Sequence, residues 1–180
     1  MSIAATTFEQ SIQDAENLLK HFDALNNNPP PRENEVLKRA GLIMAMTAWE
    51  TYVEDRLQEA GAARFEALND RALAGFIQSK LNEEIHRLHN PSSAKTLELF
   101  QNYAGTDLSG SWAWENKDHG AVRATLDRYV KLRGDVVHRS RTVEPGPPQP
   151  HPVKKDDLEK AIRFLRRLVQ ATESALAPPQ

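Results

Sequence analysis

The sequence predicts an all-α protein, an up-and-down bundle of about five long helices and one short helix. Apolar residues recur at spacings of three and four along most of the chain, which is the period of a helix packed on one side. No stretch alternates between apolar and polar residues as a half-buried strand does. The 180 residues are enough for one domain with a sizeable core, so we expect a single domain over 1–180.

The first two helices are separated by the run NNNPPP at 26–31, which neither helix can continue through. Thr6 with Glu9 predicts a capping box at the start of the first helix. Its inward stripe comprises Phe8, Ile12, Ala15, Leu19 and Phe22. The second helix runs from about Glu33 to Ala60, and its middle, AGLIMAMTAW, is apolar nearly all round. We therefore expect the second helix at the centre of the bundle.

The third helix is predicted to begin after Asn69, a good N-cap residue, and to end at Asn90, where HNP follows. Its inward stripe comprises Leu73, Ile77, Leu81, Ile85 and Leu88. A short fourth helix follows Ser92 or Ser93. The segment AGTDLSGSWAWENKDHG then has no clear period, and we interpret it as an ordered loop, because Trp112 and Trp114 are costly to leave in water.

The fifth helix is predicted from about His119 to His138 and the last from about Lys155 to Leu176. Between them, a loop at 144–152 contains five prolines and is expected to be stiff and extended. The inward residues of the last helix are Leu158, Ile162, Leu165, Leu168 and Val169.

Charge and composition narrow the class of protein. The net charge is −2, yet residues 119–170 hold 12 Lys and Arg against 6 Asp and Glu. Such a basic region either attracts phosphates or is a set of solvated helix faces. The chain has no cysteine, no span of membrane length and no secretory signal pattern at its start, so we expect a cytoplasmic protein without membrane association. It also lacks glycine-rich phosphate loops and nucleophile elbows.

Arg133 is the residue that most needs an explanation. On a helical wheel it falls within about 40° of Val122, Leu126, Tyr129 and Val137, in the middle of the apolar stripe of the fifth helix. A guanidinium is almost never buried without a partner and cannot lose its charge. Arg133 therefore either pairs with an acid of the second helix, such as Glu50 or Glu54, or opens onto a groove where a phosphate binds.

His138 follows Arg133 by five residues, which places it about 140° away on a continuous helix. We expect the helix to unwind here, because Gly134 weakens the last turns and prolines follow. Unwinding would let both side chains reach one place. A histidine near a helix C-terminus and a fixed cation suits acid–base chemistry on a phosphodiester, although a single histidine at a helix end is more often an ordinary surface residue.

The stretch from Arg133 to His138, an Arg-x4-His motif late in an amphipathic helix, resembles the signature of HEPN domains. Three further segments are similar to the RiboL-PSP-HEPN branch, named for its association with L-PSP-type ribonucleases. They are AWETYVEDRL at 48–57, LFQNYAGTDLSGSWAW at 99–114 and LEKAIRFLRRLV at 158–169. The resemblance extends from about Phe8 to Leu176.

The resemblance implies a homodimer in which the Arg–His motifs of two protomers face one cleft. Active HEPN domains are metal-independent endoribonucleases without cofactors, and many are toxins or defence effectors, toxins being held by a cognate antitoxin protein. His138 would then be the general base or acid and Arg133 would bind the phosphate. Asp135 and Glu50 would support them, and RNA would contact Lys131, Arg139 and Arg141.

The chain departs from the family pattern at two positions. Many members have Asn, Asp or His directly after the Arg, where this chain has Gly134, and a small residue after the His, where it has Arg139. Two alternatives therefore stand beside the ribonuclease: a non-catalytic HEPN module that binds RNA or protein, and a purely structural helical scaffold.

Three other patterns are open to more than one interpretation. Glu83, His86 and His89 share a helix at spacings of three, but no third strong metal ligand is evident, so we expect no metal site. Trp112 and Trp114 either clamp the loop onto the core or stack on bases. A phosphate-binding face or a solvated surface is formed by Lys154, Lys155, Arg163, Arg166 and Arg167.

Overall fold

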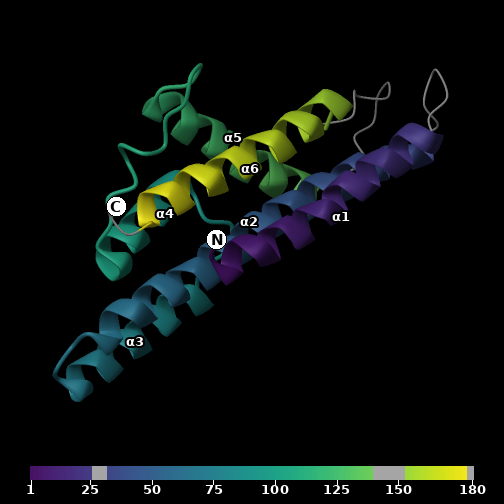
Figure 1. The fold of residues 1–180 in the computed structure, drawn as a ribbon. Helices are drawn as coiled ribbons and strands as arrows, with labels where there is room; N and C mark the ends of the chain where they lie inside the picture. The colour runs from purple at the N-terminus through teal and green to yellow at the C-terminus, as the bar shows by residue number, and fades with distance from the viewer. Residues whose placement is uncertain (26–31, 140–152, 178–180) are drawn as a thin grey trace.

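The computed structural model describes residues 1–25, 32–139 and 153–177, and these form an all-helical bundle (Figure 1). Five helices are long and one is short, as the periodicity predicts. They are α1 (Ile3–Leu25), α2 (Glu35–Glu66), α3 (Arg71–His86), α4 (Ser93–Leu99), α5 (His119–Arg139) and α6 (Lys155–Leu176). A short 3-10 turn, η1 (Arg32–Asn34), precedes α2, and a π-helical turn, η2 (Phe100–Ala104), continues α4. The predicted proline-rich loop at 144–152 lies outside the described residues.

Helix α2 is the centre of the bundle, as its apolar middle predicts. It packs against four other helices, α1, α3, α5 and α6. Trp49, Tyr52 and Leu57 are at most 1% exposed, and Trp49 packs against both Tyr52 and the distant Trp112. Because α1 lies along α2 and α6 covers both, these three helices form the main body of the molecule.

Helix α1 begins three residues before the predicted capping box. The Oγ atom of Ser2 accepts a hydrogen bond from the backbone N–H of Ala5 (3.0 Å), so Ser2 rather than Thr6 caps the helix. The backbone N–H of Ala4 donates to Glu59 of α2 (2.8 Å). Ala4 and Ala5 are themselves buried, and this burial favours an earlier start of the helix than the capping pattern alone indicates.

Helix α3 differs from its predicted form at both ends. Asp70, not Asn69, is the N-cap, and its Oδ1 atom accepts hydrogen bonds from the N–H groups of Ala72 and Leu73. The helix ends at His86, four residues before Asn90. Leu73 is 48% exposed although it belongs to the predicted inward stripe. The first turns of α3 lie beside the end of α2, where this helix pair projects beyond the other long helices, so they have little to pack against.

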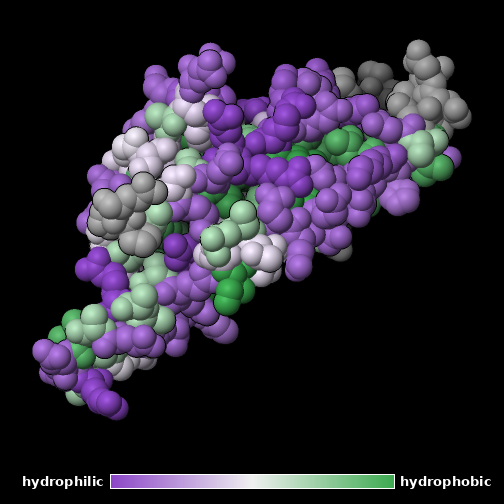
Figure 2. All heavy atoms as spheres, in the orientation of Figure 1, coloured by the Kyte–Doolittle hydropathy of each residue, from purple (hydrophilic) through white to green (hydrophobic). Residues whose placement is uncertain are grey.

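Hydrophobic atoms are therefore visible at the free end of the α2–α3 hairpin, at the lower left of Figure 2, whereas most of the surface in that view is hydrophilic. Phe76, also on α3, is 61% exposed. None of the helices in residues 1–25, 32–139 and 153–177 is both long and apolar enough to cross a membrane.

The loop before α5 is ordered, as its tryptophans predict. Trp112 is fully buried, and its indole N–H donates to the hydroxyl of Thr172 on α6 (3.0 Å). Leu108, also fully buried, helps to anchor the same segment. Trp112 thus clamps the loop onto the core, while Trp114 is only half-buried.

Candidate functional site

Helix α5 carries the candidate site and is fixed at its start and middle by polar contacts. The Oδ1 atom of Asp118 accepts from the N–H of Ala121 (2.7 Å), which caps the helix. Asp127 accepts hydrogen bonds from the backbone N–H and the Oγ of Ser93, both at 2.8 Å. One turn later, the side chain of Asn90 donates to the carbonyl of Val130 (3.1 Å). The start of α4 and the turn before it therefore hold α5 in register against α2.

The apolar stripe of α5 runs through Val122, Leu126 and Tyr129, which are at most 1% exposed. Beyond Arg133 it continues to Val136, which is 4% exposed, whereas the predicted Val137 is 42% exposed. The prediction was wrong there because the stripe advances by three residues at this turn instead of four. Arg133 still lies between two buried positions of the core-facing side.

Arg133 contacts Glu50 of α2, one of the two acids that the wheel indicates. The Nη2 atom of Arg133 lies 3.9 Å from Oε2 of Glu50, and the two side chains are 27% and 18% exposed. The Nε atom of Arg133 is buried and has no hydrogen-bond partner among the described residues. A separation of 3.9 Å is too long for a hydrogen bond. Arg133 is thus held near a carboxylate but keeps hydrogen-bonding capacity that the described part of the chain does not fill.

The α2 side of the site is acidic. Glu54 follows Glu50 by one helical turn, and burial, together with the negative charges of Glu50 and Asp55, raises the pKa of Glu54. The Nδ1 atom of His89 lies 3.9 Å from the other oxygen of Glu50, and His89 is 82% exposed. Glu50 therefore stands between Arg133 and an imidazole at the surface.

His89 is the residue that sequence reasoning missed at this site. It belongs to the turn after α3, and its approach to Glu50 depends on the way this turn folds back onto α2. Its sequence signal, the spacing from Glu83 and His86, was weighed for metal binding instead. Glu83 pairs with Lys80 (2.9 Å), and no group of three metal-ligating side chains occurs among residues 1–25, 32–139 and 153–177.

The other predicted site residues are distributed around the end of α5. Lys131 is exposed and Asp135 is half-buried. His138 and Arg139 are the last two residues of α5, and their side chains lie outside what the structure describes, as does all of Arg141. The structure thus brings Arg133 and Glu50 together and places the backbone of His138 about 1.4 helical turns beyond Arg133.

The expected unwinding between Arg133 and His138 does not occur, because α5 remains helical through Arg139. Gly134 costs helix stability, but the helical hydrogen-bond ladder and the burial of Val136 outweigh that cost. Five residues of continuous helix separate the two positions by about 140° around the axis and about 7.5 Å along it. Within one chain, Arg133 and His138 therefore belong to different faces of α5.

The basic face predicted for the start and middle of α6 is divided by the structure. Lys155 pairs with Asp23 of α1 (2.7 Å), and Arg166 pairs with Glu9 (3.1 Å) and Glu16, so these cations join helices. Lys154 is exposed. The two remaining arginines, Arg163 and Arg167, instead line a pocket with the loop that carries Trp114.

The sequence was compared with models of known protein families. The family model described as RiboL-PSP-HEPN matches residues 9–177. The chain belongs to the RiboL-PSP-HEPN family. Among the curated proteins and the solved structures that were compared, none matches it.

The match confirms that the chain resembles the RiboL-PSP-HEPN branch, as predicted from the sequence. The match covers all the candidate site residues, from Glu50 to Arg141 in the sequence, together with the loop that carries the tryptophans. The region that matches the RiboL-PSP-HEPN family therefore includes nearly the whole helical bundle.

Proposed function

We propose that this RiboL-PSP-HEPN chain is a metal-independent endoribonuclease in which Arg133 and His138 act on one RNA phosphodiester. The observation that carries the proposal is the incomplete pairing of Arg133. Its one carboxylate contact in the described part of the chain is long, and its Nε is buried without a partner. The Arg133 side chain is 27% exposed, so N–H groups that Glu50 does not use can donate hydrogen bonds to the oxygens of a phosphate.

The proposed reaction needs no cofactor. The 2′-OH oxygen of RNA forms a bond to the adjacent phosphorus, and the bond from phosphorus to O5′ breaks. The 2′ proton passes to a base, and O5′ leaves with a proton from an acid. The products are a 2′,3′-cyclic phosphate and a 5′-hydroxyl end. His138 is the base or the acid, and Arg133 offsets the negative charge that develops on the phosphate.

The geometry of α5 supports a site built by two protomers. Arg133 and His138 occupy different faces of one continuous helix, so a single phosphate is reached more easily by Arg133 of one protomer and His138 of a second copy. A twofold-symmetric dimer with the two α5 ends facing one cleft supplies such a pair twice. Lys131, Arg139 and Arg141 would then contact the RNA backbone, and Asp135 and Glu50 would orient the site.

The test is cleavage of RNA in EDTA by the wild type, His138→Ala and Arg133→Ala. We expect wild-type products with 2′,3′-cyclic phosphate ends, and a rate at least about a hundredfold lower for His138→Ala, as for removal of a general acid or base. His86→Ala and Arg87→Ala are matched controls, because both residues are exposed near the end of α3. Equal cleavage by wild type and His138→Ala, or no cleavage by any of them, would contradict the proposal.

A non-catalytic module is the second candidate, and the contact between Arg133 and Glu50 favours it. If this contact tightens in solution, Arg133 is a structural partner of Glu50, and only a basic surface remains. Gly134 and Arg139, which depart from the family pattern, point the same way. This candidate predicts RNA binding that weakens with salt but leaves the RNA intact.

The biological role belongs to the same proposal. A cytoplasmic ribonuclease of this kind would act as a toxin or defence effector, and a toxin would need a cognate antitoxin protein to cover its cleft. The contrasting hypothesis is that the bundle is a purely structural helical scaffold. Cleavage of RNA by the wild-type protein would favour the ribonuclease over the scaffold.

A further inference from the structure

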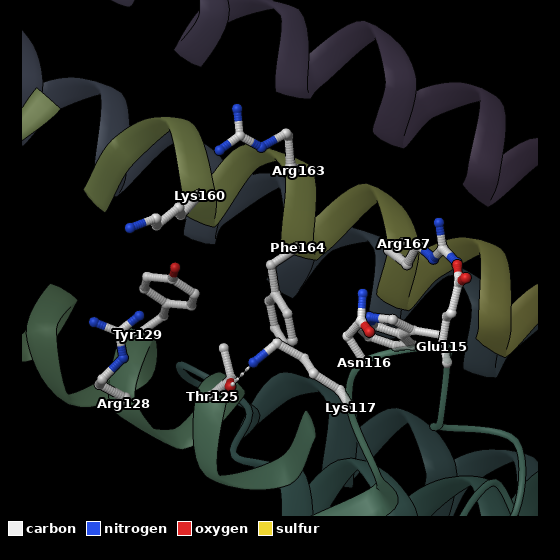
Figure 3. Close-up of a pocket in the computed structure, with 11 residues that line it drawn as sticks. Glu115, Asn116, Lys117, Thr125, Arg128, Tyr129, Lys160, Arg163, Phe164 and Arg167 are labelled. Atoms are coloured by element: carbon white, nitrogen blue, oxygen red, sulfur yellow. Dashed lines mark hydrogen bonds between the residues drawn. The ribbon is translucent and has the colours of Figure 1, made fainter. Parts of the chain in front are cut away.

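A pocket of about 480 Å³ lies between the loop at 114–117, the middle of α5 and α6 (Figure 3). Its volume is in the range of small-ligand sites. Neither Arg133 nor Glu50 lines it, because Arg133 contacts α2 whereas this pocket opens between α5 and α6. It is therefore separate from the candidate ribonuclease site, although both sites share helix α5.

One wall of the pocket is aromatic. The ring of Phe164 on α6 lies between two others, with centroid distances of 5.8 Å to Trp114 and 5.7 Å to Tyr129. Phe164 and Tyr129 are buried, whereas Trp114 is half-exposed and presents part of its indole to the pocket. An exposed aromatic face supported from behind by buried rings can stack on a planar ligand.

The rest of the lining is strongly basic. Five cationic side chains and one acidic side chain, the exposed Glu115, line the pocket. Two of the cations are paired: Lys160 with Asp156 (2.5 Å) and Arg128 with Asp157 (3.9 Å). The other three, Lys117, Arg163 and Arg167, form no ion pair within the described part of the chain. Three unpaired cations at one pocket favour an anionic ligand.

The aromatic and cationic groups are held side by side by the loop. Trp114 and Lys117 exchange two backbone hydrogen bonds, of 3.0 and 2.6 Å, which close a tight turn. The Nζ atom of Lys117 donates to the hydroxyl of Thr125 (3.2 Å), and the guanidinium of Arg167 lies 5.9 Å from the Trp114 ring centroid. Lys117 and Arg167 thus add two cations to the pocket lining that they share with Trp114, and Arg167 lies over the Trp114 ring.

We propose that this pocket binds one nucleotide unit, with the base stacked on Trp114 and the phosphate held by Lys117 and Arg167. A nucleotide has a planar ring that fits the aromatic wall and a negative group that fits the basic lining. Inorganic phosphate has no ring and would leave the aromatic wall unused. The nucleotide is either part of a single-stranded RNA or a free mononucleotide. In the first case the inference rests on the proposed function and adds a substrate subsite remote from the cleavage site.

The test measures binding without cleavage, so its outcome does not depend on ribonuclease activity. The probe is a fluorescent 2′-O-methyl RNA of mixed sequence and about 12 nucleotides, within the span that single-strand sites cover. Its 2′ oxygens are blocked, so no attack on phosphorus can occur. Fluorescence anisotropy gives the Kd for the wild type, Trp114→Leu, Lys117→Gln and Arg167→Gln. Arg71→Gln and Arg87→Gln are control variants, because both residues are exposed cations at the ends of α3.

We expect the Kd to rise at least about fivefold for each pocket variant and to remain unchanged for both controls. Competition by UMP and AMP identifies the source: mononucleotides that bind as tightly as the oligonucleotide indicate a free ligand, and mononucleotides that bind much more weakly indicate RNA. The proposal would be overturned by pocket variants that bind the RNA probe as tightly as the wild type does and from which UMP and AMP displace the probe equally well. Inorganic phosphate that competes as well as UMP would also overturn it, because the base would then contribute nothing.

Discussion

At the scale of single residues, Arg133 shows how a sequence pattern can identify a position that needs an explanation. Its place on the apolar stripe is evident from the wheel, and Glu50 was one of two partners that helix geometry indicates. The loose 3.9 Å contact and the unpartnered Nε were not predictable, because they depend on side-chain placement across two helices. Those two details are the basis of the proposal that Arg133 donates hydrogen bonds to a phosphate.

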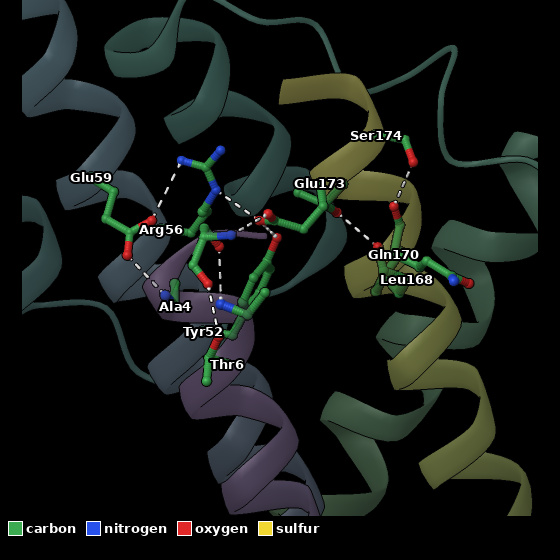
Figure 4. A network of polar contacts seen from close by, with 12 residues as sticks. Ala4, Thr6, Tyr52, Arg56, Glu59, Leu168, Gln170, Glu173 and Ser174 are labelled. Carbon is green, nitrogen blue, oxygen red and sulfur yellow. Dashed lines mark hydrogen bonds and ion pairs between the residues drawn. The ribbon is translucent and has the colours of Figure 1, made fainter. Parts of the chain in front are cut away.

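Glu173 on α6 is a contrasting residue, because its charge is fully used within the fold (Figure 4). It accepts hydrogen bonds from the hydroxyl of Tyr52 (2.9 Å) and from Nε of Arg56 (2.7 Å), both on α2. The backbone N–H of Ser2, just before α1, also donates to it (3.3 Å). Burial acts to raise the pKa of Glu173, but the hydrogen bonds and charge of Arg56, with the bond from Tyr52, outweigh burial and lower it.

We expect Glu173→Gln to lower the free energy of unfolding at pH 7 by about 2 kcal/mol, the usual cost of losing hydrogen bonds to a charged group. Because the folded-state pKa is lowered, this stability is present above the ordinary carboxyl pKa and is lost as the pH falls through the folded-state value. Urea unfolding at pH 7 and at pH 3 tests this, and the difference from wild type should shrink at pH 3.

The matched control is Glu66→Gln, because Glu66 is exposed at the end of α2. Its unfolding free energy should stay within about 0.5 kcal/mol of wild type at both pH values. A Glu173→Gln protein as stable as wild type at pH 7 would show that the network does not join the three helices energetically.

At the scale of elements, helix α5 combines three functions. Its core-facing side packs on α2, its middle lines the nucleotide pocket, and its end carries the Arg-x4-His motif. The helix continues through Gly134 to Arg139, so both residues of the motif lie on a continuous helix and not on an unwound turn. Gly134 therefore lowers the stability of α5, but the helix still forms.

We predict that Gly134→Ala stabilises the protein by about 0.5–1 kcal/mol, because alanine in a helix interior loses less conformational entropy on folding than glycine. A Cβ atom built at Gly134 meets none of the described residues within 4 Å, so no clash with them opposes the gain. The melting temperature measured by circular dichroism reports the change. At Gly41 the same substitution should bring no gain, because its Cβ would lie 2.7 Å from Leu158. A destabilised Gly134→Ala would mean that α5 is not continuous in solution.

Helix boundaries could be predicted from the sequence where the apolar periodicity ends at prolines or at polar capping residues. The bounds of α6, Lys155–Leu176, and the start of α5 at His119 were predicted correctly from apolar spacing and the neighbouring prolines and polar residues. The ends of α3 were not predicted correctly. At its start, Asn69 and Asp70 are residue types that are equally favoured as N-caps, so the sequence does not choose between them. Leu73 was expected to be inward, yet no partner helix extends far enough to cover it.

At the scale of the whole molecule, the bundle and its family follow from the sequence, but the meeting of distant segments does not. Trp114 and Lys117 come from a loop without periodicity, and they meet Phe164 and Arg167 about fifty residues later in the chain. The basic residues of α6 are evident in the sequence, but the pattern does not distinguish Arg166, which joins helices, from Arg167, which lines the pocket. This distinction depends on the packing of α6 against α1.

Cleavage by mixed protomers tests most directly the claim that Arg133 and His138 act together on one phosphate across a dimer. Arg133→Ala and His138→Ala proteins are each expected to be inactive. After unfolding and refolding together in equal amounts, half of the dimers are mixed, and each mixed dimer regains one composite site. We predict recovery of about a quarter of wild-type cleavage in EDTA. No recovery, although mixed dimers are present by mass spectrometry, would contradict a site shared between two protomers.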